Sequence, residues 1–188
     1  ENRFNLNYLL CGSEGTLAVV CEAKLRLTKI PKYKHLLVLK YESFDDALRD
    51  AEILVESEPA AIETIDEKIL SLARTDEIYN KIKSFIADEK TNSGKITRPT
   101  RTINLVEFSG NNKIKMERRI SFLCKVVEKN KNESGKATGY YRTADQNEIK
   151  NLWNLRKKGV GLLGKTEGER KPIPFIEDTA VPVKNLAR

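Results

Sequence analysis

An arginine within an apolar helical pattern is the side chain of this sequence best suited to bind an anion. The pattern covers residues 143–163, and at about 100° per residue its apolar side chains gather on one side. These apolar residues are Ile149, Leu152, Trp153, Val160 and Leu163. Arg156 falls within about 20° of Ile149, so its guanidinium either pairs with an internal carboxylate or binds an anion from outside. Asp178 and Glu177 are the candidate internal partners.

A turn near the N-terminus is the second candidate site. It follows Leu9 and Leu10 and reads Gly12-Ser13-Glu14-Gly15-Thr16. The two glycines can adopt backbone angles closed to other residues, which leaves main-chain N–H groups free to meet phosphate oxygens. The same sequence is also typical of an ordinary connection between strands.

Two strand-helix-strand units position these candidates. The expected elements are strand 35–41, helix 44–56 and strand 60–65, then strand 102–108, a helix through Val127 and strand 137–142. Ser43, three residues before Asp46, is placed to cap the first helix, and Asn111 or Asn112 can cap the second. The pattern predicts an α+β fold, a ferredoxin-like split βαβ sandwich with an antiparallel sheet and helices on one face.

Three further segments flank or interrupt these units. Residues 18–27 read as a strand that Pro31 closes, and 66–87 carry two helical patterns. The polar stretch 88–100 contains Gly94 and Pro99 and reads as a mobile loop. We interpret residues from about 66 to 100 as a helical insertion.

Composition limits the classes of protein to consider. The 188 residues are 39% hydrophobic, with a net charge of +7. Lys and Arg alternate with Asp and Glu, and no basic segment carries regularly spaced aromatics, so we expect no nucleic-acid partner. A basic surface with weak attraction to a membrane fits better. Cys11, Cys21 and Cys124 are far apart, so we expect each to be a small buried residue, with no metal site in this chain.

Four strings, in order, resemble a known family. They are Gly12-Ser13-Glu14-Gly15-Thr16-Leu17, Leu105-Val106-Glu107-Phe108-Ser109-Gly110, Leu152-Trp153-Asn154-Leu155-Arg156 and Ile176-Glu177-Asp178-Thr179-Ala180-Val181-Pro182. The first resembles the end of a FAD-binding domain of the vanillyl-alcohol-oxidase (PCMH) type. The others resemble the C-terminal cap domain of FAD-linked oxidases such as D-lactate and D-2-hydroxyglutarate dehydrogenases. The resemblance implies a fragment: 1–31 end the FAD-binding domain, and 32–188 form a cap domain incomplete at its C-terminus.

The resemblance also implies roles for these residues. The parent would oxidise a D-2-hydroxy acid by hydride transfer to FAD. Gly12, Ser13, Glu14, Gly15 and Thr16 would contact FAD through their backbone, and Arg156 would hold the substrate carboxylate. Ile176 stands where some hydroxyglutarate-type members have a lysine, so the acid is not fixed. The family's catalytic histidine and metal motif have no counterpart here; His35, the one histidine, matches no motif, and a structural role is expected.

The expected partners are the small 2-hydroxy acid, the remaining parts of the flavoprotein and an unidentified electron acceptor. An iron–sulfur cluster or a divalent metal would be bound outside this chain. We expect a cytoplasmic location, or a peripheral contact with the inner membrane, and no activity of the chain alone. The alternatives are a ferredoxin-like regulatory or small-molecule-binding module without catalysis and a basic domain for nucleic acid or anionic lipid.

Overall fold

The computed structural model describes residues 4–90, 96–164 and 180–187. The chain forms two compact units, Glu1–Ile30 and Pro31–Arg188. The first contains one short helix, α1 (Asn7–Leu10). The elements of the second are β1 (Tyr33–Tyr41), α2 (Phe44–Glu56), β2 (Ala61–Ile65), α3 (Glu67–Arg74), α4 (Tyr79–Ile82), β3 (Glu89–Lys90), β4 (Ile96–Arg98), β5 (Thr102–Gly110), α5 (Lys113–Asn130), β6 (Gly139–Thr143), α6 (Gln146–Gly164) and the 3-10 turn η1 (Val183–Asn185).

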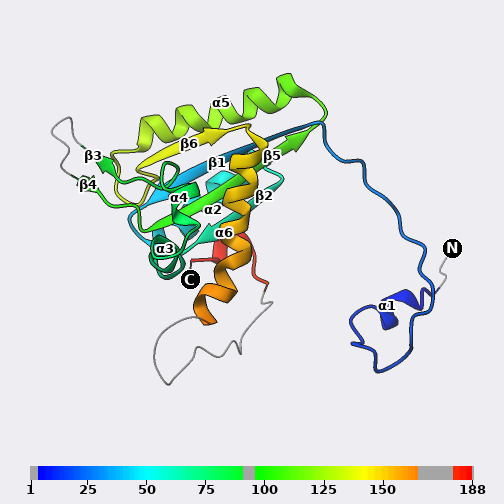
Figure 1. Cartoon of the computed structure of the whole chain (residues 1–188). Coiled ribbons are helices and arrows are strands. Elements are labelled where there is room, and N and C mark those ends of the chain that lie inside the picture. Colours follow the sequence, from blue (N-terminus) through cyan, green and yellow to red (C-terminus); the bar gives the residue numbers. More distant parts are fainter. Residues whose placement is uncertain (1–3, 91–95, 165–179, 188) are drawn as a thin grey trace. The chain divides into compact units, whose positions relative to one another are not determined.

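A four-stranded sheet organises the second unit (Figure 1). Its strand order is β2-β5-β1-β6, and every neighbouring pair is antiparallel. Strands β1 and β5 pair along their whole length, from Tyr33 opposite Gly110 to Tyr41 opposite Thr102. In both strand-helix-strand units the helix connects two strands that lie on either side of a third. This is the split βαβ arrangement, and the predicted α+β fold is confirmed.

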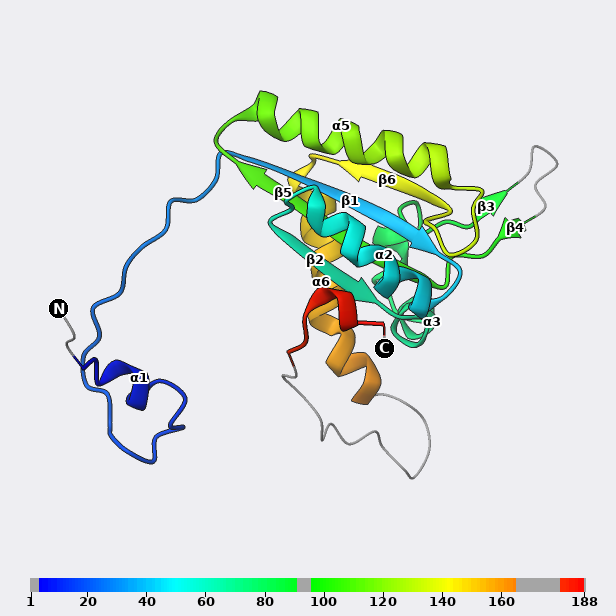
Figure 2. The ribbon, with the colours of Figure 1, turned by 180° about the vertical axis from the view of Figure 1, so that it is seen from behind.

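The helices of the two repeated units, α2 and α5, lie on one face of the sheet, as predicted (Figure 2). Alternate residues of β1, including Leu37 and Leu39, point into the core beneath them. Both predicted caps are present. The Ser43 hydroxyl accepts the N–H of Asp46 at 3.1 Å, and the Asn112 side chain caps α5 by accepting a backbone N–H from the first turn.

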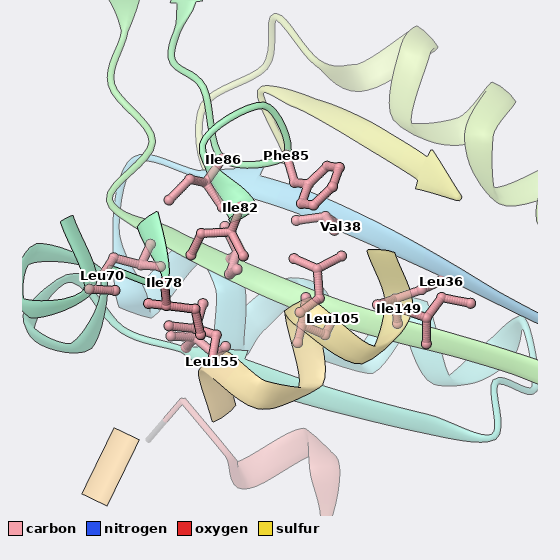
Figure 3. Packing of buried hydrophobic residues seen from close by; sticks show 14 residues of the cluster. Leu36, Val38, Leu70, Ile78, Ile82, Phe85, Ile86, Leu105, Ile149 and Leu155 are labelled. Carbon is pink, nitrogen blue, oxygen red and sulfur yellow. The ribbon is translucent and has the colours of Figure 1, made fainter. Parts of the chain in front are cut away.

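The opposite face of the sheet is covered as well, which the prediction of helices on one face did not include. Helices α3, α4 and α6 pack there over a second core (Figure 3). Its buried members include Leu36, Val38, Leu70, Ile82, Leu105, Ile149 and Leu155. The predicted insertion of about 66–100 supplies α3 and α4. It therefore completes the core instead of extending from a finished domain.

The expected mobile loop at 88–100 is corrected in part. Its two ends pair as a short antiparallel ribbon, with Glu89 opposite Arg98, and residues 91–95 lie outside the described part of the chain. The Arg98 guanidinium donates to Glu42 at 2.7 Å, and the Asp88 carboxylate accepts the N–H of Thr100 at 2.7 Å. The first bond ties the segment to Glu42, next to the end of β1, and the second joins the two ends of the segment to each other.

The strand expected at 18–27 is absent from the first unit. Residues 17–32 have no helix or strand, and apolar side chains such as Val19 and Leu27 are exposed. A strand needs a hydrogen-bonded neighbour, and within the described residues nothing pairs with this segment. The expected burial of Cys11 and Cys21 is wrong, because both lie in this unit and are exposed. Cys124, in α5, is buried.

Candidate functional site

Arg156 lies off the middle of the buried side of α6. The side chains that α6 buries against the sheet are Ile149, Leu152 and Leu155. At about 100° per residue, the centre of these three side chains lies roughly 60° from Ile149 and roughly 40° from Arg156. The sequence pattern had placed Arg156 close to the centre. The expected apolar stripe is thereby corrected. The pattern had omitted Leu155, and the side chains of Val160 and Leu163 lie outside the described part of the structure.

The internal partner of Arg156 is a glutamate of strand β2. Its Nε donates to Oε1 of Glu63 at 2.7 Å, with 55% of the arginine side chain and 33% of the glutamate side chain exposed. Glu177 and Asp178, the partners considered from the sequence, lie outside the described residues. The ion pair is open to water, so it is weak and does not lock the guanidinium away.

This ion pair lines an open hollow of about 360 Å³. The walls come from α2, β2, the start of α3 and α6, and include Phe44, Thr64 and Ile69. A guanidinium has five N–H donors, and the bond to Glu63 uses one of them. The planar end of Arg156 is therefore available for a second, bidentate contact with a carboxylate.

A buried glutamate that the sequence reading passed over holds α6 on the sheet. Glu107 of β5 accepts the indole N–H of Trp153 at 2.9 Å and the ammonium of Lys34 at 3.1 Å. Glu107 points to the same face as Leu105, two residues earlier in β5. The sequence does contain a signal for this role, because a glutamate that alternates with apolar residues on the inward side of a strand must find a polar partner. Trp153 and Arg156 lie three residues apart on α6, and each donates a hydrogen bond to a glutamate of the sheet, Trp153 to Glu107 and Arg156 to Glu63.

The glycine turn of the first unit has the backbone that its sequence predicts. Gly12, Glu14 and Gly15 have φ angles of 86°, 50° and 77°. The turn is closed by the N–H groups of Ser13 and Thr16, which donate to Leu10 and Ser13 carbonyls. The N–H groups of Gly12, Glu14 and Gly15 are not used by these two bonds. Successive main-chain donors at positive φ suit an anion such as phosphate, so the turn fits the role expected for FAD. That role stays a prediction.

His35 lies on the α5 side of the sheet, away from the Arg156 hollow. Its Nε2 is 3.4 Å from Glu117, and its Nδ1 is 3.4 Å from an Arg142 nitrogen. Burial lowers the pKa of His35 below its usual range; Glu117 opposes this effect, and Arg142 and Lys113 add to it. A neutral imidazole between strands and helix agrees with the structural role expected.

Two kinds of feature are not found in the described part of the chain. Residues 4–90, 96–164 and 180–187 contain no group of three or more His, Cys, Asp or Glu side chains placed to hold a metal ion. No helix among them has the length and apolar character needed to cross a membrane.

The split βαβ sheet with helices on both faces is an α+β domain, and Arg156 lines a hollow on one of those faces. Residues 30–188 match the family "FAD linked oxidases, C-terminal domain", and the chain belongs to this family. The whole chain is 43% identical to the D-2-hydroxyglutarate dehydrogenase of Haemophilus influenzae, of which it spans 18%. It is 26% identical, over 98% of its length, to the glycolate oxidase subunit GlcD of Bacillus subtilis, of which it spans 34%. The predicted family is confirmed.

A solved structure agrees on the fold. An alkyldihydroxyacetonephosphate synthase superposes on 87% of this chain with a TM-score of 0.55 and 17% sequence identity, and the match covers 29% of that protein. At this identity the likeness concerns the fold alone. In every one of these comparisons the chain spans about a third or less of the relative.

Proposed function

We propose that this chain is the substrate-binding part of a FAD-dependent enzyme that oxidises a D-2-hydroxy acid to the 2-oxo acid. The observation that carries the proposal is Arg156, whose guanidinium lines an open hollow in a chain of the FAD-linked oxidase family. Identity of 43% to a D-2-hydroxyglutarate dehydrogenase supports D-2-hydroxyglutarate as the acid in preference to D-lactate.

In this proposal the substrate carboxylate binds the planar end of Arg156. Glu63 accepts from Nε and leaves the other N–H donors of the guanidinium for the carboxylate. Oxidation removes a hydride from C2 and a proton from the hydroxyl group, and FAD is the hydride acceptor. The backbone of the glycine turn, residues 12–16, contacts FAD. The group that takes the hydroxyl proton is not assigned to this chain.

Replacement of Arg156 in the full-length flavoprotein tests the proposal. Arg156→Leu removes a charge-assisted contact of about 1.5–3 kcal/mol, so kcat/KM for D-2-hydroxyglutarate falls roughly 10- to 150-fold. Arg156→Lys keeps the charge but loses the planar fork of donors, so its kcat/KM falls less. Arg101→Leu is the matched control, because 54% of that side chain is exposed and its pair with Glu67 is 3.8 Å long. If the Arg156→Leu and Arg101→Leu enzymes have the same kcat/KM, Arg156 has no role in substrate binding.

A further inference from the structure

The outward face of α5 carries apolar and basic side chains that the fold does not use. Figures 1 and 2 show α5 lying along the sheet with one side turned away from it. At about 100° per residue, seven exposed residues lie within roughly 60° of Arg118. They are Ile114, Lys115, Arg118, Ser121, Phe122, Lys125 and Lys129. We call this set the α5 outer face. Ile114 and Phe122 are 68% and 66% exposed.

The α5 outer face is positive without internal compensation. Four of its seven members are Lys or Arg, and none is acidic. The acidic side chains of α5 lie to its sides and have partners of their own. Glu117 pairs with His35 and Arg142, and Glu128 pairs with Lys131 at 2.8 Å. An anionic partner would therefore meet uncompensated charge on this face.

The shape of the face selects among anionic partners. A shallow depression of about 520 Å³ lies here, and its lining comes from α5 alone. Besides members of the α5 outer face it includes Lys113 and Glu117, and Glu117 is paired with His35 and Arg142. A groove for a peptide helix or strand needs walls from two elements, and the described residues provide one. A convex helix with Phe and Ile among Lys and Arg is suited to a flat surface, where the apolar side chains enter the boundary between headgroups and acyl chains.

We propose that the α5 outer face binds the surface of a bilayer containing anionic phospholipid. Lys115, Arg118, Lys125 and Lys129 meet the headgroup phosphates, and Ile114 and Phe122 enter the interface. The contact is peripheral. It is independent of the function proposed for Arg156, because α5 and α6 cover opposite faces of the sheet.

Vesicle sedimentation with the 188-residue chain tests the proposal. The probes are vesicles of phosphatidylcholine alone and of phosphatidylcholine mixed with phosphatidylserine, at low and at physiological salt. Each cation near an anionic surface strengthens binding by about fivefold, so Arg118→Glu/Lys125→Glu weakens binding by at least about 25-fold. Phe122→Ser weakens binding at both salt concentrations, because the apolar contribution is not screened. The matched control is Lys68→Glu/Lys150→Glu, an equal change of charge at exposed positions on α3 and α6.

The expected result is sedimentation with the mixed vesicles only, lost in Arg118→Glu/Lys125→Glu and kept in the control variant. Equal losses in both double variants would show attraction to net charge and overturn the proposal. Failure of the chain to sediment with mixed vesicles at low salt would also overturn it. Self-association abolished by Phe122→Ser, without vesicle binding, would identify a second copy of the chain as the occupant and exclude the bilayer.

Discussion

Removal of the Glu107 carboxylate tests whether the sheet holds α6 through the Trp153 indole. Glu107 accepts the indole N–H at 2.9 Å and pairs with Lys34 at 3.1 Å. A buried hydrogen bond to a charged group contributes about 1.5–3 kcal/mol to stability. The Lys34 side chain is partly exposed, so that pair adds about 0.2–1 kcal/mol. Glu107→Ala should therefore lower the free energy of unfolding by about 2–4 kcal/mol.

The interaction is isolated by a double-mutant cycle with Trp153→Phe. This replacement keeps an aromatic ring and removes the N–H, so the coupling energy between the two positions reports the hydrogen bond. We expect a coupling of about 1.5–3 kcal/mol, measured by urea unfolding with an unchanged dependence on urea concentration. Lys34→Met should cost less than about 1 kcal/mol. A coupling energy below about 0.5 kcal/mol would refute the reasoning, because independent positions add within that margin.

Two other predictions concern the cofactor and His35. The 188-residue chain alone should neither retain FAD after desalting nor reduce a dye with D-lactate or D-2-hydroxyglutarate; a yellow, active preparation would contradict this. Burial lowers the pKa of His35 in the folded chain, so its contribution to stability is complete above the unfolded-state pKa of about 6.5 and is lost as the pH falls from there through the lower folded-state pKa. Urea unfolding between about pH 7.5 and 5.5 should show a smaller loss of stability for His35→Gln than for the unchanged chain. An equal loss would assign the pH dependence to other groups.

Much of the second unit could be predicted because its local signals and its long-range pairing agree. The apolar run of β1, the caps at Ser43 and Asn112 and the period of α5 each indicated the element that forms. That helices also cover the second face of the sheet was harder to predict. The helices that cover it come from the insertion and from α6, and periodicity does not say which side of a sheet a helix packs against.

The site was predicted in type but not in geometry. Arg156 was identified by its position among apolar residues, yet Leu155 takes the buried position beside it. Its partner Glu63 is 93 residues away in sequence, and no pattern near α6 indicates that pairing. The segment 18–27 shows the opposite case. It is rich in residues that favour strands, but a strand forms only beside a second strand, and the local sequence does not show whether one is present.

The pairing of β2 with β5 has a consequence for the direction of Arg156. In this ladder Ala61 stands opposite Glu107 and Glu63 opposite Leu105, so the acids that hold Trp153 and Arg156 share one side of adjacent strands. A slip of β2 by a single residue would turn Glu63 to the other side of the sheet and leave the guanidinium without its anchor. The main-chain hydrogen bonds at this edge of the sheet thus set the position of the carboxylate that Arg156 contacts, although Arg156 itself belongs to α6.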